Sequence, residues 1–280
     1  MEKIVAGIIS FNPEIKRLKE NICAITNQCD CLYLIDNGSG NINDVIELLN
    51  KINDEKITLI RNNKNKGIAR ALNQLCEIAL GNGYEWIITL DQDSVCPLNL
   101  TAQYKKYIGG SGIGMLCPLI VDRNKNINRK IKRNKITDIS ECITSGSMLN
   151  LLVWRKIGGF DEYMFIDGVD FDICHRIKKE GYRIIQINEV CLLHELGHIT
   201  THKLLFLNVI VKNHTAFRKY YIARNTIYLA KKEHNKLLFI KSLLQNIKLA
   251  SIVIFYESEK KEKLKSIYKG TLEGIRTSIL

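Results

Sequence analysis

The stretch Trp86-Ile-Ile-Thr-Leu-Asp-Gln-Asp93 joins an apolar run directly to two carboxylates. Trp86–Leu90 has the length and the β-branched composition of a buried strand. Because side chains alternate along an extended chain, Asp91 and Asp93 point to the same side and can bind one cation. Oxygen ligands at this spacing suit Mg²⁺ or Mn²⁺, which would bridge to diphosphate oxygens. Asp also caps helices, and Pro97 is typical of a helix start, so the pair alone leaves both interpretations open.

The residues before this stretch alternate between strand-like and helix-like segments. The predicted strands are Ile4–Ser10, Cys31–Asp36 and Ile57–Arg61, and the predicted helices lie near 13–27, 42–52 and 67–80. Such alternation predicts βαβ units, and therefore an α/β fold with a mostly parallel central sheet flanked by helices.

Polar residues follow each of the four predicted strands. They are Ser10–Phe11–Asn12, Asp36–Asn37–Gly38, Arg61–Asn62–Asn63 and Asp91–Gln92–Asp93. Ligands of open α/β sheets bind beyond the carboxyl ends of the strands. Each segment alone would be an ordinary turn, but four in a row predict one shared pocket.

The composition is that of a folded protein. Of 280 residues, 46% are hydrophobic, 25% are charged and only three are proline, which excludes disordered and fibrous classes. The nine cysteines are an odd number, scattered and mostly set in apolar runs, without a CxxC pair. They indicate reduced thiols in a reducing compartment, and we expect no cysteine metal site.

The formal charge of +12 is concentrated at one end of the chain. Residues 1–200 carry 25 basic against 24 acidic side chains, whereas residues 201–280 carry 16 against 5. The basic region also contains the apolar stretches Leu237–Ile240 and Ile252–Tyr256. This mixture suits an anionic membrane surface better than nucleic acid, which we exclude as a partner, although an ordinary solvated basic helix has the same pattern.

We therefore expect a cytoplasmic protein whose C-terminal region contacts the inner face of the membrane or a second copy of the chain. Met1–Glu2–Lys3 leads directly into the first strand, so no signal peptide is expected. Lys241, Gln245 and Lys248 interrupt the best candidate for a membrane span.

Two regions follow the predicted strands. Residues 204–256 have apolar side chains at three- and four-residue spacing without Gly or Pro, which predicts helices. Arg123–Lys135 is rich in basic residues and Asn and predicts a solvated loop. We expect a catalytic domain over 1–200 and a basic helical region over 201–280.

Six ordered motifs between residues 4 and 230 resemble those of the family 2 glycosyltransferases of the GT-A fold, particularly bacterial rhamnosyltransferases. They are Gly7-Ile-Ile-Ser-Phe-Asn-Pro13, Ile35-Asp-Asn-Gly-Ser39, Asn62-Asn-Lys-Asn-Lys-Gly-Ile-Ala69, Leu90-Asp-Gln-Asp-Ser94, Gly158-Gly-Phe-Asp-Glu162 and Phe165-Ile-Asp-Gly-Val-Asp-Phe-Asp-Ile-Cys-His-Arg176. The resemblance implies a Rossmann-like GT-A domain and an inverting glycosyltransferase. It implies transfer of L-rhamnose from dTDP-L-rhamnose to a hydroxyl of a cell-surface glycan or lipid-linked intermediate. A UDP-hexose donor is the alternative.

The resemblance also assigns the donor site. Asp36 would accept the N3–H of uracil or thymine, an arrangement that the unprotonated N3 of cytosine cannot make. Phe11 and Asn12 would flank the base and ribose, and Asn65 and Gly67 would let the backbone approach the nucleotide. Their simpler interpretation is turn chemistry.

The charged groups of the donor follow in the same way. Asp93 would be the main metal ligand, and Asp91 would hold the ribose or the metal. Arg224 would reach the diphosphate, or else belong to a helix face that docks through neighbouring tyrosines.

Asp170 is the predicted catalytic base. The family pattern of a Glu-Asp or Val-Asp pair, then an acidic residue, Cys and Arg, matches Val169-Asp170 with Asp172, Cys174 and Arg176. A carboxylate here would take the proton of the acceptor hydroxyl during in-line attack. Asp167 and Asp172 compete for this role, and Asp172 is spaced to pair with Arg176 four residues later. We assign Asp161 and Asp167 to acceptor binding, with a helix-start carboxylate as the other interpretation of Asp161.

His194-Glu-Leu-Gly-His198 spells the zinc metallopeptidase motif HExxH. The motif functions only on a helix, whereas Ile184–Leu193 predicts a strand that runs into it, and Gly197 weakens a helix. A zinc peptidase built on His194, Glu195 and His198 is therefore the less favoured alternative. In the glycosyltransferase interpretation His194 is a third metal ligand or a hydrogen-bond donor to the diphosphate, and a buried structural histidine is the other option.

Overall fold

The computed structural model describes residues 3–122, 134–194, 200–204 and 207–279. Contacts divide the chain into two compact units. The first comprises Met1–Tyr163 and Asp170–Glu195, and the second comprises Met164–Val169 and Leu196–Leu280. The loop expected at Arg123–Lys135 lies almost wholly outside the described residues.

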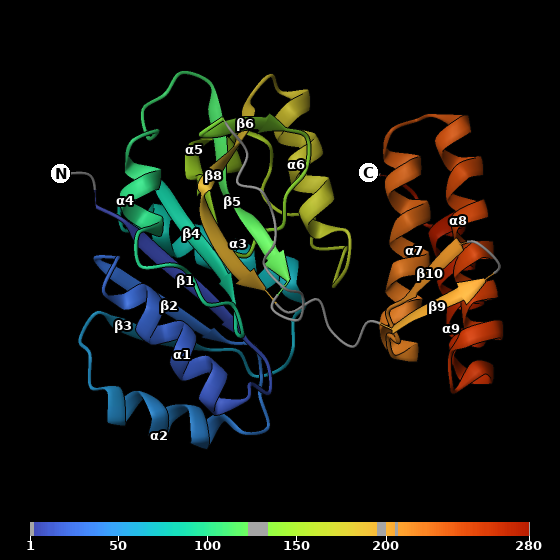
Figure 1. The fold of residues 1–280 in the computed structure, drawn as a ribbon, viewed down its shortest axis with the longest axis horizontal. Helices are drawn as coiled ribbons and strands as arrows, with labels where there is room; N and C mark the ends of the chain where they lie inside the picture. Colours follow the sequence, from blue (N-terminus) through green and yellow to red (C-terminus); the bar gives the residue numbers. More distant parts are fainter. Residues whose placement is uncertain (1–2, 123–133, 195–199, 205–206, 280) are drawn as a thin grey trace. The chain divides into compact units, whose positions relative to one another are not determined.

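The first unit contains an eight-stranded sheet in the order β3-β2-β1-β4-β7-β5-β8-β6 (Figure 1). Its strands are β1 (Val5–Ser10), β2 (Cys31–Asp36), β3 (Ile57–Arg61), β4 (Trp86–Asp91), β5 (Ile113–Asp122), β6 (Ile136–Ile139), β7 (Ser147–Asn150) and β8 (Arg183–His194). β1 pairs in parallel with β2 and β4, β2 with β3, and β5 with β8, whereas β7 and β6 run antiparallel to their neighbours. The predicted mostly parallel α/β sheet is confirmed.

Six helices of the first unit connect or flank these strands. They are α1 (Ile15–Thr26), α2 (Ile42–Ile52), α3 (Ile68–Gly81), α4 (Leu100–Lys105), α5 (Leu151–Lys156) and α6 (Val169–Lys179), whose first residue falls in the second unit. The three helices predicted near 13–27, 42–52 and 67–80 are present. Local chemistry sets their ends: α2 stops at Asn53, which takes the left-handed conformation (φ 48°), and the Asn150 side chain caps the start of α5.

The core of the first unit follows from the alternation of side chains along the strands. Ala6 and Ile8 of β1, together with Ile4 just before the strand, belong to one apolar cluster with side chains of α1, α2 and α4. The opposite face of β1 meets α3. A Cβ at Gly7 would lie 2.7 Å from Leu75 of α3, so the glycine permits this close contact between strand and helix.

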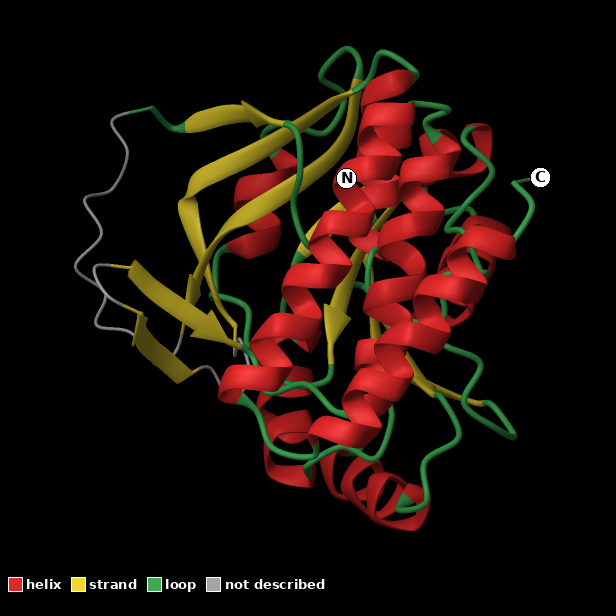
Figure 2. Ribbon diagram, turned by 90° about the vertical axis from the view of Figure 1, so that its right-hand side faces the viewer, coloured by secondary structure: helices red, strands yellow, loops and turns green. Residues whose placement is uncertain are grey.

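The second unit begins with a strand pair and continues with three long helices. β9 (Thr200–Leu204) and β10 (Leu207–Val211) pair antiparallel. The prediction of helix over 204–256 was therefore wrong for 207–211, because β-branched residues such as Val209, Ile210 and Val211 favour a strand and find a partner in β9. The helices are α7 (Ala216–Lys232), α8 (Lys236–Tyr256) and α9 (Lys260–Arg276), which lie side by side in Figure 2.

Small residues and buried charges hold these three helices together. A Cβ at Gly270 of α9 would lie 2.2 Å from the carbonyl oxygen of Tyr220 in α7, so only glycine allows this approach. Lys219 and Lys263 are almost fully buried, and their ammonium groups lie 2.6 and 3.1 Å from the carboxylate of Glu257. Burial lowers the pKa of Lys219, although Glu257 opposes this shift. Such a cluster fixes the geometry because breaking any one pair leaves a buried charge uncompensated.

Within the described part of the chain, α8 is the one helix long and apolar enough to cross a membrane by length and composition. Its most apolar 18-residue window has a mean hydropathy of 1.6, and 17% of that window is buried. Lys241 and Lys248, the lysines that led us to expect no membrane span, lie within this helix. The helix reaches a mean hydropathy of 1.6 although it contains them.

We expect Gly270→Ala to destabilise the second unit by about 1–3 kcal/mol, because the added methyl group forces α7 and α9 apart. Gly81→Ala is the matched control, since a Cβ at this helical glycine of the first unit meets no atom within 4 Å. Urea unfolding followed by circular dichroism measures both. A neutral or stabilising Gly270→Ala would contradict the close packing.

Candidate active site

The carboxyl ends of four parallel strands lie at one edge of the sheet. Ser10 is in register with Asp36, Asp36 with Arg61, and Ile9 with Asp91. This alignment brings together the polar segments that follow β1, β2, β3 and β4, as the sequence predicted.

A pocket of about 450 Å³ opens at the ends of β2 and β3. It is lined by Asp36, Gly38, Ser39, Ile42, Arg61, Asn62 and Asn63. Asp36 is 2% exposed, and its Oδ2 accepts hydrogen bonds from the backbone N–H groups of Gly38 (3.2 Å) and Ser39 (3.1 Å). Its Oδ1 is buried and has no hydrogen-bond partner among the described residues. Asp36 is therefore a fixed carboxylate in the lining of the pocket, and its buried Oδ1 retains the capacity to accept a hydrogen bond.

Asn37 joins the loops that follow β2 and β3. Its side-chain amide donates to Asn65 Oδ1 (3.1 Å) and to the Gly67 carbonyl (3.3 Å), while its oxygen accepts from Asn62 (3.0 Å) and from the Lys66 N–H (3.1 Å). Gly67 has a φ of 84°, which favours glycine, and it directly precedes α3. Asn65 and Gly67, both predicted to bind the nucleotide, thus determine the conformation of the loop beside the pocket.

Phe11 and Asn12 follow β1 at the same edge. The Phe11 N–H donates to Gln92 Oε1 (2.8 Å), and the Phe11 ring is 42% exposed. Asn12 receives the Gly40 N–H on its Oδ1 (2.8 Å), and its own N–H donates to Ser39 Oγ (2.8 Å). The hydrogen bonds of Asn12 therefore hold the loop after β2 in place, whereas Phe11 is partly accessible to a ligand.

Asp91 is the last residue of β4 and Asp93 lies in the turn that follows it, and both are partly exposed. The Asp91 N–H donates to Ser145 Oγ (3.0 Å), and the Asp91 carbonyl accepts from Asn21 (2.6 Å), so the backbone here is held from two sides. In the part of the chain that the structure describes, no group of three His, Cys, Asp or Glu side chains forms a metal site. The chain turns at Gln92 and Asp93, where the Ser94 N–H donates to the Asp91 carbonyl (3.2 Å), so the extended geometry from which a shared side was predicted ends at Asp91. Carboxylate oxygens suit Mg²⁺, which commonly keeps water and diphosphate oxygens as its other ligands, and the binding of one cation by both residues stays a prediction.

The residues beside Ser145 connect this strand end to Asp170. The Thr89 hydroxyl donates to the Thr144 carbonyl (2.7 Å), and the Thr144 N–H donates to Asp170 Oδ1 (2.8 Å). Asp170, in the first turn of α6, is therefore linked to Thr89 of β4 through two hydrogen bonds of Thr144. These hydrogen bonds link β4 to Asp170 within the first unit, and a common site for the predicted metal ligands and the predicted base stays a prediction.

Asp172 is a poor competitor for the role of base. It is 4% exposed, and its Oδ2 accepts from both Nε (2.8 Å) and Nη2 (2.5 Å) of Arg176. The i,i+4 pair that the sequence predicted is present. Arg176 also donates to the Ile157 carbonyl (2.7 Å), so the pair anchors α6 to the segment after α5.

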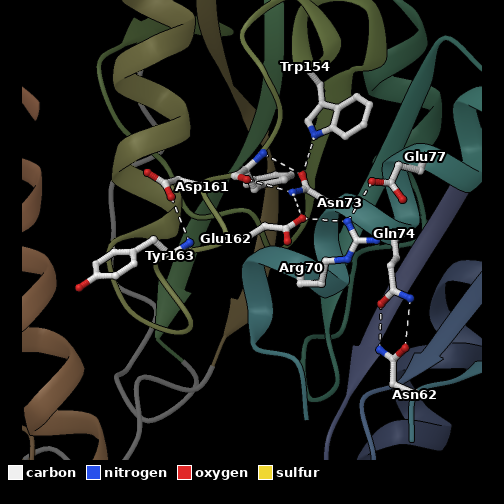
Figure 3. Close-up of polar contacts among 10 residues, drawn as sticks. Asn62, Arg70, Asn73, Gln74, Glu77, Trp154, Asp161, Glu162 and Tyr163 are labelled. Atoms are coloured by element: carbon white, nitrogen blue, oxygen red, sulfur yellow. Dashed lines mark hydrogen bonds and ion pairs between the residues drawn. The ribbon is translucent and has the colours of Figure 1, made fainter. Parts of the chain in front are cut away.

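A buried network around Asn73 fixes the segment that carries Asp161 (Figure 3). The Asn73 amide donates to the Phe160 carbonyl (2.9 Å) and Glu162 Oε1 (2.8 Å), and its oxygen accepts from Trp154 Nε1 (3.1 Å) and the Phe160 N–H (2.8 Å). Both the nitrogen and the oxygen of the Asn73 side chain thus hold residues 160–162. Sequence reasoning missed it, although a polar residue on the apolar face of a predicted helix is a usable signal for such a network.

Charge reinforces the same contact. Arg70 donates to Glu162 Oε1 (2.9 Å) and to Glu77 Oε1 (3.2 Å). Partial burial raises the pKa of Glu162, but the hydrogen bonds from Asn73 and Arg70 outweigh it and hold the pKa below its ordinary value. Asp161 Oδ1 accepts from the Tyr163 N–H (3.1 Å), a local turn rather than a helix start.

Asp167 and Arg224 belong to the second unit. Asp167 adopts a φ of 64°, and its carboxylate binds Arg218 in a bidentate ion pair with distances of 2.9–3.1 Å. Arg224 is 6% exposed, lies 4.7 Å from the centre of the Tyr221 ring, and donates to Asn225 (3.0 Å). These contacts match the docked-helix interpretation of Arg224, and its contact with a diphosphate stays a prediction.

His194 is the last residue of β8, where its backbone is in register with Asp122 of β5. Its side chain, and residues 195–199, lie outside the description. Because His194 is in a strand, it cannot begin the helix that the HExxH chemistry needs. The zinc peptidase interpretation is therefore not supported, and His194 as a metal ligand is untested.

Comparisons with known proteins agree with this geometry. Residues 6–177 match the sequence model of the family described as "Glycosyl transferase family 2". The chain is 30% identical to the dTDP-rhamnosyl transferase RfbF of Shigella flexneri, across 98% of this chain and 95% of that protein.

Solved structures show the same fold. Residues 1–349 of S. aureus TarS in complex with UDP-GlcNAc superpose with a TM-score of 0.62 at 10% identity, covering 96% of this chain and 80% of that one. The mannosyltransferase PcManGT from Pyrobaculum calidifontis, in complex with GDP-Man and Mn²⁺, gives a TM-score of 0.58 at 15% identity and covers 99% and 76%.

The family model and the 30% identical relative show that the protein is a glycosyltransferase, and the solved structures show the GT-A fold. The chain belongs to glycosyl transferase family 2.

We expect Asn73→Ala to lower the free energy of unfolding by about 2–4 kcal/mol, because the Trp154 and Phe160 N–H groups lose their buried acceptor. Glu77→Gln is the control, since it removes one exposed ion pair worth at most about 1 kcal/mol. Urea unfolding of both variants tests this; equal, small effects would mean that Asn73 is not the anchor of this segment.

Proposed function

We propose that this glycosyltransferase moves L-rhamnose from dTDP-L-rhamnose to a hydroxyl of a cell-surface glycan or a lipid-linked intermediate. The relative named a dTDP-rhamnosyl transferase, which aligns over almost the whole of both chains, supports the choice of donor over a UDP-hexose. The fixed carboxylate of Asp36 in the lining of the pocket is the observation that supports donor recognition. It can accept the N3–H of thymine, which cytosine lacks.

The diphosphate of the donor would be held next to its thymine ring. Asp93, with Asp91, would bind Mg²⁺ or Mn²⁺, which supplies positive charge against the leaving diphosphate. A neighbour of this fold contains Mn²⁺ with its nucleotide sugar, which supports a metal-dependent enzyme. The loop at Asn65 and Gly67 and the exposed face of Phe11 would enclose the nucleoside. Arg224 is proposed for the diphosphate only through the family resemblance.

Asp170 would activate the acceptor. Its carboxylate takes the hydroxyl proton while the acceptor oxygen forms a bond to the anomeric carbon. The bond from that carbon to the diphosphate oxygen breaks on the opposite side, so the configuration inverts and dTDP leaves. The Thr144 N–H bound to Oδ1 fixes the carboxylate during this step. Asp161 would bind the acceptor sugar, and Asp167 would do so only by releasing Arg218.

The setting of the reaction follows from the cysteines. All nine are free thiols, and burial raises the pKa of several, including Cys29 and Cys96 to about 12. Free thiols, most of them buried or half-buried, fit a reducing compartment, so we infer a cytoplasmic enzyme. We propose that residues 1–200 form the catalytic domain and 201–280 an accessory region.

Donor binding can be tested by thermal shift. In the presence of Mn²⁺ we expect dTDP-L-rhamnose, at a hundredfold excess over its Kd, to stabilise the wild type by about 2.7 kcal/mol. UDP-glucose and GDP-mannose at the same concentration should stabilise it less. Asp93→Ala should lose the Mn²⁺-dependent part, whereas Asp138→Ala, on the edge strand β6, should keep it. Unchanged dTDP affinity with Mn²⁺ in Asp93→Ala would remove the metal role.

The base assignment has its own test. Asp170→Asn keeps the shape of the side chain but cannot accept the proton, so turnover should fall by about 10²–10⁴ while donor binding is retained. Single-turnover transfer of radiolabelled sugar measures the step, with Asp138→Asn as the control. Near-normal turnover would assign the base elsewhere.

A further inference from the structure

One face of α8 exposes large apolar side chains. Leu237, Ile240, Leu244, Ile247, Ile254 and Phe255 are 46–76% exposed. Their three- and four-residue spacing places most of them along one side of the helix. Single exposed apolar residues are ordinary, but a contiguous row of six marks a surface that binds something.

The opposite side of α8 is fixed within the second unit. Ser242, Asn246 and Val253 are buried there. The Asn246 amide donates to the Ala223 carbonyl of α7 (2.9 Å) and to the Thr271 hydroxyl of α9 (2.9 Å). These bonds set the rotation of α8, so the apolar row is a constant feature of the unit's surface.

The charged side chains of α8 itself are all positive. α8 contains Lys236, Lys241 and Lys248 and no acidic residue. Lys241 and Lys248 are exposed and each follow an exposed leucine or isoleucine by one position. A second copy of α8 laid on this face would bring lysines against lysines. An anionic lipid surface offers both the apolar phase and the opposite charge.

We propose that α8 lies in the plane of an anionic membrane interface, with its apolar row among the acyl chains and its lysines at the lipid headgroups. A crossing orientation would bury the ammonium group of Lys248, the thirteenth of 21 residues, near the bilayer centre, which is unfavourable. It would also expose the polar anchor at Asn246 to lipid. The inference goes beyond the proposed sugar transfer and does not depend on which donor is used.

Flotation of the full chain with lipid vesicles tests the proposal. We expect binding to vesicles that contain phosphatidylglycerol and weak binding to phosphatidylcholine alone. Leu244→Glu/Ile247→Glu should weaken binding by at least about 100-fold, because two apolar side chains leave the lipid. Lys241→Glu/Lys248→Glu should weaken it by about 30-fold or more and reduce its salt dependence. Leu98→Glu/Leu152→Glu, at two exposed leucines of the first unit, is the matched control.

Other outcomes would overturn the proposal. Absence of flotation, or flotation that Leu244→Glu/Ile247→Glu leaves intact, would show that this face does not bind lipid. A dimer seen by light scattering that the same variant dissociates would assign the face to a second copy of the chain. Protein that stays with the vesicles after combined high-salt and alkaline extraction would indicate a crossing helix. Circular dichroism and dTDP binding of each variant show whether it is folded.

Discussion

The in-register parallel pairing of β1 with β2 and β4 is the constraint on which the site depends. Backbone hydrogen bonds in these ladders align Ser10, Asp36, Arg61 and Asp91 at one edge of the sheet. A shift of one residue in any strand would turn its side chains to the other face and move its last residue out of line with the others. The apolar cores on both faces of the sheet prevent such shifts, so packing far from the pocket sets its geometry.

The loops that follow the strands form the rest of the candidate site, and the side-chain amides of two asparagines hold these loops in place. Asn37 joins the segments after β2 and β3, and Asn73 holds the segment that carries Asp161. Each uses donors and acceptors at once, which no carboxylate or ammonium group can do. The site therefore combines carboxylates with ligand-binding capacity and carboxamides that give the surrounding backbone one conformation.

The sequence predicted the first four strands, the first three helices and the clustering of their ends, because apolar periodicity and turn residues are local signals. It did not predict the partners of Asn73 or the β9–β10 pair, because these depend on residues distant in the chain or on a short segment that only a neighbouring strand stabilises. The i,i+4 contact of Asp172 with Arg176 was predictable from spacing, whereas the bidentate pair of Asp167 with Arg218 spans 51 residues and was not.

The adjacent residues Thr144 and Ser145 contact the two halves of the site from a single stretch of backbone. Ser145 binds the end of β4, and Thr144 binds Asp170. One peptide unit, which is planar and rigid, therefore ties the backbone at the end of β4 to the Asp170 carboxylate, so a substitution that shifts this stretch would disturb both at once.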